Sequence, residues 1–253
     1  MEVFYSSMFF IFGSVLASFY CVLATRIPEG KSIVKPRSHC EHCNHILKWY
    51  ELIPIFSYLF LRGKCRECHK KIPIYEFICE IITGLLFIGS YLYFGFSYSL
   101  WVSLFLISLL ILIFISDFKY MIILDSPLVI TIIAIFLLKV LYFDWQTAFL
   151  SLLDGAILFV FMLFIAYIGK KIFKRDALGG GDIKLSFVIG FTVGLPYGFM
   201  VLVLSTFLAL PYATFSLLTN SSHEVPYGPF LISALCIVFL YYEKFSYILN
   251  LFS

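Results

Sequence analysis

Residues 99–117 read SLWVSLFLISLLILIFISD, an uncharged apolar run that ends on a single aspartate. A run of about 18 or more apolar residues can cross the hydrocarbon core of a bilayer as a helix. The whole chain has this character, because 62% of its 253 residues are hydrophobic and only 13% are charged. Soluble domains carry about 25% charged residues, so this composition excludes a water-soluble globule, a disordered chain and a secreted disulfide-stapled module. The sequence predicts an all-α polytopic membrane protein.

Similar apolar runs recur along the chain, and about eight transmembrane helices fit its length. Each run is expected to be helical because lipid cannot satisfy exposed backbone groups. A break near Pro196 separates the sixth and seventh runs, with a kink in one long span as the alternative. The expected spans are 3–25, 74–94, 99–116, 127–143, 147–169, 183–196, 197–218 and 229–249.

The charged residues divide the chain into unlike parts. Residues 26–72 hold ten Lys/Arg and four Asp/Glu, a net charge of +6, whereas the whole chain has a net charge of +3. We expect residues 1–25 to form the first transmembrane helix and residues 26–72 to form a small polar module. Residues 96–253 are expected to form a second domain inside the membrane.

Basic residues also predict the orientation in the cell membrane. With eight spans, 16 of the 18 Lys/Arg fall on the side of the polar module, and only Lys139 and Lys244 lie opposite. By the positive-inside rule, this side faces the cytoplasm. The basic surface either binds anionic lipid or only sets the topology, since basic residues near such lipid contribute about 1 kcal/mol each. The expected surroundings are a lipid membrane, and no nucleic acid partner is expected.

Four cysteines form two C-x2-C pairs in the polar module, Cys40 with Cys43 and Cys65 with Cys68. Two such pairs can direct four thiolates at one metal ion, as in a zinc ribbon. A disulfide is disfavoured in the reducing cytoplasm, and a redox C-x-x-C would occur singly within a βαβ pattern. Four thiolates leave no open coordination position, so we expect a structural Zn²⁺ that holds the module together.

Other side chains near these cysteines are less favoured as metal ligands. Four histidines of the module are expected to be solvated neighbours, with His42 or His69 as the alternative ligands: His39, His42, His45 and His69. The three cysteines outside the module are expected to be ordinary core residues: Cys21, Cys79 and Cys236.

Two aspartates stand where apolar spans meet the membrane surface. Asp117 ends one span, and Asp182 begins another directly after Gly179-Gly180-Gly181. Two spans lie between the acids, so both are predicted at the cytoplasmic boundary. Two carboxylates held close share a proton, so that one can activate water while the other donates. The glycines leave room for an extended substrate backbone; a flexible loop with two interfacial acids is the alternative.

Further ionisable residues accompany these acids. Asp125 is a candidate third acid at the same boundary, while Asp144 and Asp154 are expected near the opposite face. Glu80 lies within the second span and needs a partner or water there. Lys184 lies two residues after Asp182, so it does not face that acid and is expected to extend to the lipid headgroups.

These motifs resemble those of the type IV prepilin peptidases, the bacterial leader peptidases among the GxGD aspartyl proteases. The resemblance covers most of the chain. Asp117 is similar to the first catalytic aspartate of that family, and residues 178–184 resemble the motif of the second. The other resembling segments are PRSHC (36–40), ELIP (51–54), RGKC (62–65), EIITG (80–84) and VPYGP (225–229).

The resemblance implies a membrane-embedded aspartyl endopeptidase that removes the basic leader of prepilins or pseudopilins at the cytoplasmic face. Many members also methylate the new N terminus with S-adenosylmethionine, and Gram-positive members often serve a competence pseudopilus. It implies catalytic roles for Asp117 and Asp182 and a methyltransferase-like region that extends to about residue 95. Supporting roles are implied for Gly179, Gly180, Gly181, Lys184, Pro226, Gly228, Pro229 and Glu80.

The chain departs from the family pattern at three positions. Ala17 and Cys21 stand where Gly and Asn are common, which bears on methyl transfer. Leu124 stands where Pro is common, and we expect little effect on cleavage. Two functions of other classes compete with a peptidase, a zinc-stapled membrane scaffold and a transporter. A transporter would hold its acids near the midplane of the membrane.

Overall fold

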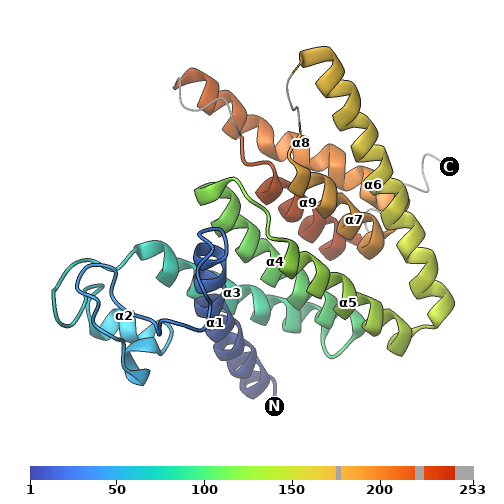
Figure 1. The fold of residues 1–253 in the computed structure, drawn as a ribbon. Coiled ribbons are helices and arrows are strands. Elements are labelled where there is room, and N and C mark those ends of the chain that lie inside the picture. The colour runs from blue at the N-terminus through green and yellow to red at the C-terminus, as the bar shows by residue number, and fades with distance from the viewer. Residues whose placement is uncertain (175–177, 220–224, 243–253) are drawn as a thin grey trace. The chain divides into compact units, whose positions relative to one another are not determined.

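A computed structural model describes residues 1–174, 178–219 and 225–242, and these residues form helices joined by loops (Figure 1). The chain divides into two compact units, Met1–Leu100 (unit 1) and Trp101–Ser253 (unit 2). Within the described residues, six helices are long and apolar enough to cross a membrane. The prediction of an all-α polytopic membrane protein is therefore confirmed.

Unit 1 is built on two long helices that lie side by side, α1 (Glu2–Arg26) and α3 (Ile74–Phe94). A Cβ atom on Gly84 of α3 would lie 2.7 Å from Ser14 Oγ of α1, so the two backbones are in close contact there. Small residues at a helix crossing allow this approach within a membrane. The polar segment between these helices contains a short 3-10 helix, η1 (Trp49–Leu52), and a short α-helix, α2 (Phe56–Phe60).

The remaining helices form unit 2, apart from the first residues of α4, which belong to unit 1. They are α4 (Tyr98–Tyr120), α5 (Asp125–Tyr142), α6 (Trp145–Phe173), α7 (Gly180–Val193), α8 (Leu195–Leu218) and α9 (Gly228–Leu240). Each of the eight expected spans thus corresponds to a helix. Residues 243–249 of the last expected span lie outside the described residues, as do Arg175 and Lys244.

The break near Pro196 separates two helices rather than kinking one. Gly194 has φ +82°, which stops α7, and Pro196 lies in the first turn of α8, where its missing N–H costs nothing. This break leaves α7 with only 14 residues. At about 1.5 Å per residue such a helix is about 21 Å long, shorter than the roughly 30 Å hydrocarbon core of a bilayer.

Helix α7 is at the centre of unit 2, where it packs against α5, α6, α8 and α9. Its closest approach is to α6, through Gly190 of α7 and Gly155 of α6. A Cβ atom on Gly190 would lie 2.6 Å from the carbonyl oxygen of Asp154, and one on Gly155 would lie 2.8 Å from that of Phe187. The two backbones therefore touch, and this contact fixes the crossing point of α6 and α7.

Candidate active site and candidate metal centre

Unit 2 brings the two predicted acids together. Asp117 lies in the last turn of α4 and Asp182 in the first turn of α7, and their side chains are buried, with exposures of 6% and 8%. Ile123 contacts Gly181, the residue before Asp182, and also Gly228, which contacts Asp117, so both acids lie around the same isoleucine. The backbone N–H of Gly228, at the start of α9, donates to Asp117 Oδ2 at 3.1 Å. Three segments that are distant in sequence thus meet at one place.

Asp182 keeps an unused acceptor at this meeting point. Its Oδ1 atom is buried and has no hydrogen-bond partner among the described residues. Buried polar atoms in folded proteins are almost always paired, and an exception calls for an explanation such as a bound water or a catalytic role. The Oδ1 atom therefore marks a position where a water molecule or a substrate group can bind.

The three glycines before Asp182 have different structural roles. A Cβ atom on Gly181 would lie 2.7 Å from the Cβ of Ile123, and one on Gly179 would lie 2.9 Å from Asp182 Oδ2. A Cβ atom on Gly180 would meet no atom within 4 Å. Gly179 has φ −68°, so close packing rather than a left-handed backbone explains glycine at that position.

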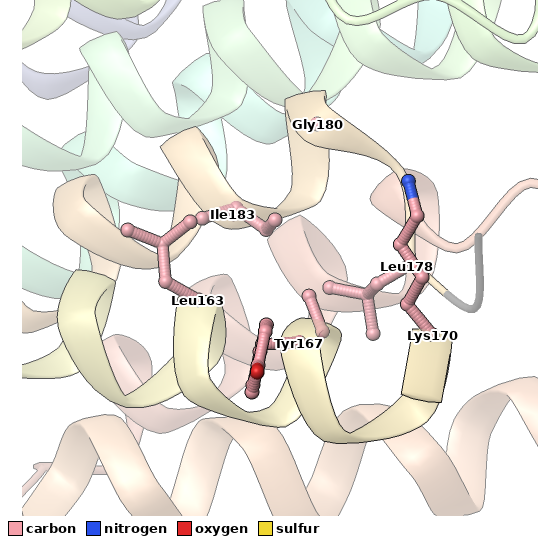
Figure 2. A pocket seen from close by; sticks show the side chains of 7 residues that line it. Leu163, Tyr167, Lys170, Leu178, Gly180 and Ile183 are labelled. Carbon is pink, nitrogen blue, oxygen red and sulfur yellow. The ribbon is translucent and has the colours of Figure 1, made fainter. Parts of the chain in front are cut away.

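A cavity of about 380 Å³ opens beside Gly180. Figure 2 shows it lined by Leu163, Tyr167 and Lys170 of α6, by Gly180 and Ile183 of α7, and by Leu178, which precedes α7. The lining is largely apolar, and the Lys170 amine lies at one edge. This space adjoins the glycine run, so a chain lying along that run has room for a side chain.

The turn before α9 places the other predicted supporting residues around Asp117. Pro226, Gly228 and Pro229 are all buried. A Cβ atom on Gly228 would lie 3.0 Å from Asp117 Oδ2 and 2.7 Å from Ile123 Cδ1. Ile123 therefore contacts both Gly181 and Gly228, a role that sequence reasoning missed because one isoleucine in an apolar chain carries no distinguishing signal.

Tyr227, in the same turn, was likewise not singled out as a site residue. Its hydroxyl lies 2.6 Å from Ser205 Oγ of α8, and the Asp182 carboxyl group acts on it electrostatically. The aromatic position of the Pro-Tyr-Gly-Pro turn was the only signal that could have found it. The turn is thus connected to α8 as well as to α4.

The expectation that Lys184 extends to the lipid headgroups stays a prediction, but the structure gives this side chain an ionic partner that the sequence did not indicate. Its Nζ donates to both carboxylate oxygens of Asp125, at 2.7 and 2.8 Å. The two side chains come from the first turns of α7 and α5, which lie side by side, so an ionic partner is within reach. Both side chains are more than half exposed, and exposed ion pairs contribute little to stability.

Glu80, which needed a partner inside its span, has several within unit 1. Its Oε2 accepts a hydrogen bond from the backbone N–H of Ile55 at 2.7 Å, and the Ser18 side chain also interacts with it. Its own backbone carbonyl accepts from Ser14 Oγ of α1 at 3.1 Å. Glu80 therefore connects α1 and α3 to the polar segment between them.

The four cysteines of the polar module form a candidate metal centre. Their Sγ atoms all lie within 4.8 Å of one another, and Cys40–Cys68 and Cys43–Cys65 are each separated by 3.8 Å. A tetrahedral zinc ion with bonds of about 2.3 Å to sulfur requires sulfur–sulfur distances of about 3.8 Å. The arrangement of these thiols therefore fits a tetrahedral ion.

The two cysteine pairs sit on turns with the same backbone pattern. Cys40 N–H donates to His45 O at 2.9 Å, and Cys65 N–H donates to Lys70 O at 2.8 Å. Asn44 and His69 occupy matching positions, each with φ +55°. Among the described residues, the group that could hold a metal ion consists of the four cysteines, without His42 or His69.

Glu51 is the buried acid of this module. Its Oε2 accepts from Lys48 N–H at 2.8 Å and lies 3.3 Å from His45 Nε2. Burial alone would raise the pKa of Glu51, but these hydrogen bonds and the charges of His45 and Arg66 hold the pKa below its ordinary value. Its Oε1 atom is buried and has no partner among the described residues, so an ionised carboxylate keeps one free acceptor.

Two family models match the chain, and each covers a different part of it. Residues 11–94 match the bacterial peptidase A24 N-terminal domain, and residues 104–214 match the type IV leader peptidase family. A prepilin leader peptidase/N-methyltransferase of Bacillus subtilis is 33% identical over 93% of this chain and 94% of its own length. One of Vibrio cholerae is 32% identical, over 94% of this chain and 98% of its own. No solved structure matches the chain.

A pair of alanine substitutions tests the different roles of the glycines. Gly181→Ala forces its new methyl group against Ile123, and such overpacking costs about 1–3 kcal/mol, so the unfolding temperature in detergent should fall. Gly180→Ala meets open space and should unfold at the wild-type temperature. Equal unfolding temperatures for the two variants would contradict the packing described for Gly181.

Proposed function

Because this chain belongs to the type IV leader peptidase family, we propose that it removes the leader of prepilins or pseudopilins by aspartyl catalysis, with Asp117 and Asp182 as the catalytic groups. One observation carries the proposal. Two buried carboxyl groups from helices distant in sequence lie around Ile123 and Gly228, and one of them has an unpartnered oxygen beside a glycine run. A multi-pass membrane scaffold would not need either feature, and a transporter would bind its cargo near the midplane.

The chemistry follows from two neighbouring carboxyl groups that hold one proton between them. The ionised group takes a proton from a water molecule, whose oxygen attacks the carbonyl carbon of the scissile peptide. The protonated group donates a hydrogen bond to the carbonyl oxygen and stabilises the negative charge that develops there. Collapse of the tetrahedral intermediate breaks the C–N bond, and the amine leaves with a proton from the dyad.

Gly228 and the glycine run assist these groups in different ways. The Gly228 N–H holds Asp117 Oδ2, so that Asp117 presents its other oxygen to the site. The glycine run leaves the approach to Asp182 free of side chains, and the cavity beside Gly180 can receive an apolar side chain of the substrate. We place this site and the cysteine module at the cytoplasmic face, on the basis of the Lys/Arg distribution.

Unit 1 supports a second activity, transfer of a methyl group from S-adenosylmethionine to the new N terminus. The two relatives from Bacillus subtilis and Vibrio cholerae carry N-methyltransferase in their names. The free Oε1 acceptor of Glu51 fits the amino and hydroxyl donors of S-adenosylmethionine. When bound, that cofactor would supply the methyl group; Glu51 would orient it, while a structural zinc ion on the four cysteines would hold the module around Glu51.

Substituting either acid tests the peptidase. Asp117→Asn and Asp182→Asn should each lower the cleavage rate by roughly 100-fold or more, because an amide can neither accept nor donate the catalytic proton. Cleavage is measured as a size shift of a co-expressed prepilin. Asp144→Asn is the matched control, because Asp144 only caps the N terminus of α6 and asparagine caps equally well. Appreciable cleavage by Asp117→Asn would rule out the dyad.

Metal analysis of the purified protein tests the cysteine site. Wild-type protein should carry about one zinc per chain, and Cys43→Ser should lose it, because only three thiolates remain. Cys236→Ser, which removes a cysteine of α9 outside the cluster, should keep the metal. Retention of zinc by Cys43→Ser would show that the four cysteines are not the ligand set.

Mass spectrometry of the mature substrate tests methyl transfer. The cleaved N-terminal peptide should gain one methyl group only when S-adenosylmethionine is present. Glu51→Gln should abolish this gain and leave cleavage intact, because Glu51 belongs to unit 1 and the acids to unit 2. Glu29→Gln, at an exposed acid of the same segment, is the control. Full methylation by Glu51→Gln would remove Glu51 from the proposed cofactor site.

A further inference from the structure

One buried charge in unit 2 has no part in the chemistry above. Lys139 lies in the last turn of α5 with an exposure of 7%. Its Nζ donates to Ser151 Oγ of α6 at 2.7 Å and to the backbone carbonyl oxygen of Phe191 of α7 at 2.6 Å. The amine also lies 4.7 Å from the centre of the Phe191 ring, and the charge of Asp154 acts on it. A charged side chain within a membrane is costly and calls for a functional explanation.

The contact with Phe191 provides a hydrogen-bond donor for a carbonyl group at the C-terminal end of α7. The last four carbonyls of a helix have no partner within the helix. Gly190 O accepts from Gly194 N–H. Because the chain changes direction at Gly194, no further turn of α7 follows to offer an N–H group to Phe191 O. Because α7 has only 14 residues, it cannot carry both of its ends out of the hydrocarbon core, where lipid provides no partner. The Lys139 amine supplies one, and its positive charge suits the negative end of the helix dipole.

This contact also sets the position of Asp182, since α7 carries Asp182 in its first turn and Phe191 in its last. Two lysines connect α7 to α5, Lys184 through Asp125 at one end and Lys139 through Phe191 at the other. The first pair is exposed and therefore weak. The Lys139 amine is buried and donates hydrogen bonds to both α6 and α7, so it restrains movement of α7 along its axis far more strongly.

We propose that Lys139 is a positioning residue, which caps the C-terminal end of α7 and so holds Asp182 in place against Asp117. The proposal rests on the proposed peptidase function for its effect on rate. Ser151 of α6 completes the arrangement, because its Oγ accepts from the amine, and the charge of Asp154 on the same helix acts on the amine at longer range. No group of this cluster touches the substrate.

The test compares two substitutions of Lys139 in the full chain in detergent. Lys139→Met keeps the length and loses the charge and both hydrogen bonds. It should lower kcat by about 10- to 100-fold, the effect expected for a small displacement of a catalytic group, with KM nearly unchanged. Lys139→Arg keeps the donors and should recover most of kcat. Lys171→Met, an exposed lysine of α6, should behave as wild type.

Hydrogen–deuterium exchange gives a readout that does not require activity. Lys139→Met should exchange faster than wild type not only near Phe191 but also in residues 179–186, at the far end of α7. If wild-type protein cleaved no prepilin, the proposed function would fail, and this exchange would still decide the role of Lys139. Unchanged kcat, or exchange confined to the end of α7 near Phe191, would overturn the proposal.

Two additional variants keep the test decisive. Asp154→Asn in the Lys139→Met background removes the acid left without its balancing charge. If this change restored kcat, an unpaired Asp154 rather than the lost cap would be responsible, and the proposal would be overturned. If Lys139→Met does not yield folded protein, Ser151→Ala removes one acceptor of the amine. It should lower kcat and speed exchange in residues 179–186; wild-type values for both would overturn the proposal.

Discussion

The hydrocarbon core of a bilayer offers no hydrogen-bond partners, and α7 is too short to carry both of its ends beyond it. One end must therefore be completed from within the protein. In unit 2 the Lys139 amine completes the C-terminal end, while the N-terminal end bears Asp182 and the glycine run. The position of α7, and with it the position of Asp182 relative to Asp117, therefore depends on how its C-terminal end is held.

Close packing also fixes the positions of the helices of unit 2, in addition to these hydrogen bonds. Gly155 and Gly190 bring the backbones of α6 and α7 into contact, and Ile123 fills the space between Gly181 and Gly228. Gly228 in turn donates to Asp117. A single apolar side chain thus touches the glycine beside one acid and the glycine that holds the other. A side chain at either glycine would collide with Ile123, which explains why both positions lack one.

Much of this architecture could be predicted from the sequence, because the signals were long or chemically specific. Long apolar runs predicted the spans, and Pro196, two residues after Gly194, predicted the break between α7 and α8. The spacing of Cys40, Cys43, Cys65 and Cys68 predicted a cluster, which the structure brings within 4.8 Å. The even number of spans between Asp117 and Asp182 placed both acids at one boundary, and in unit 2 both lie around Ile123.

Contacts between helices could not be predicted in the same way. Helices that face lipid on one side and protein on the other are apolar all round, so their sequences do not show which face is buried. The partners of Lys139, the pairing of Lys184 with Asp125 and the central place of Ile123 all depend on helix rotation. The partner of Lys184 was missed for this reason, since sequence spacing excluded Asp182 as a partner but did not reveal Asp125.

The proposed catalysis requires the side chains of Asp117 and Asp182 to lie next to each other in unit 2. Cross-linking of an Asp117→Cys/Asp182→Cys double variant in membranes measures this directly, with the joined peptides identified by mass spectrometry. A rapid disulfide between positions 117 and 182 is predicted, and the Asp117→Cys/Asp144→Cys pair should not cross-link. Failure of the first pair to cross-link with a membrane-permeable oxidant that joins an Asp125→Cys/Lys184→Cys pair would show that the two acids are not neighbours.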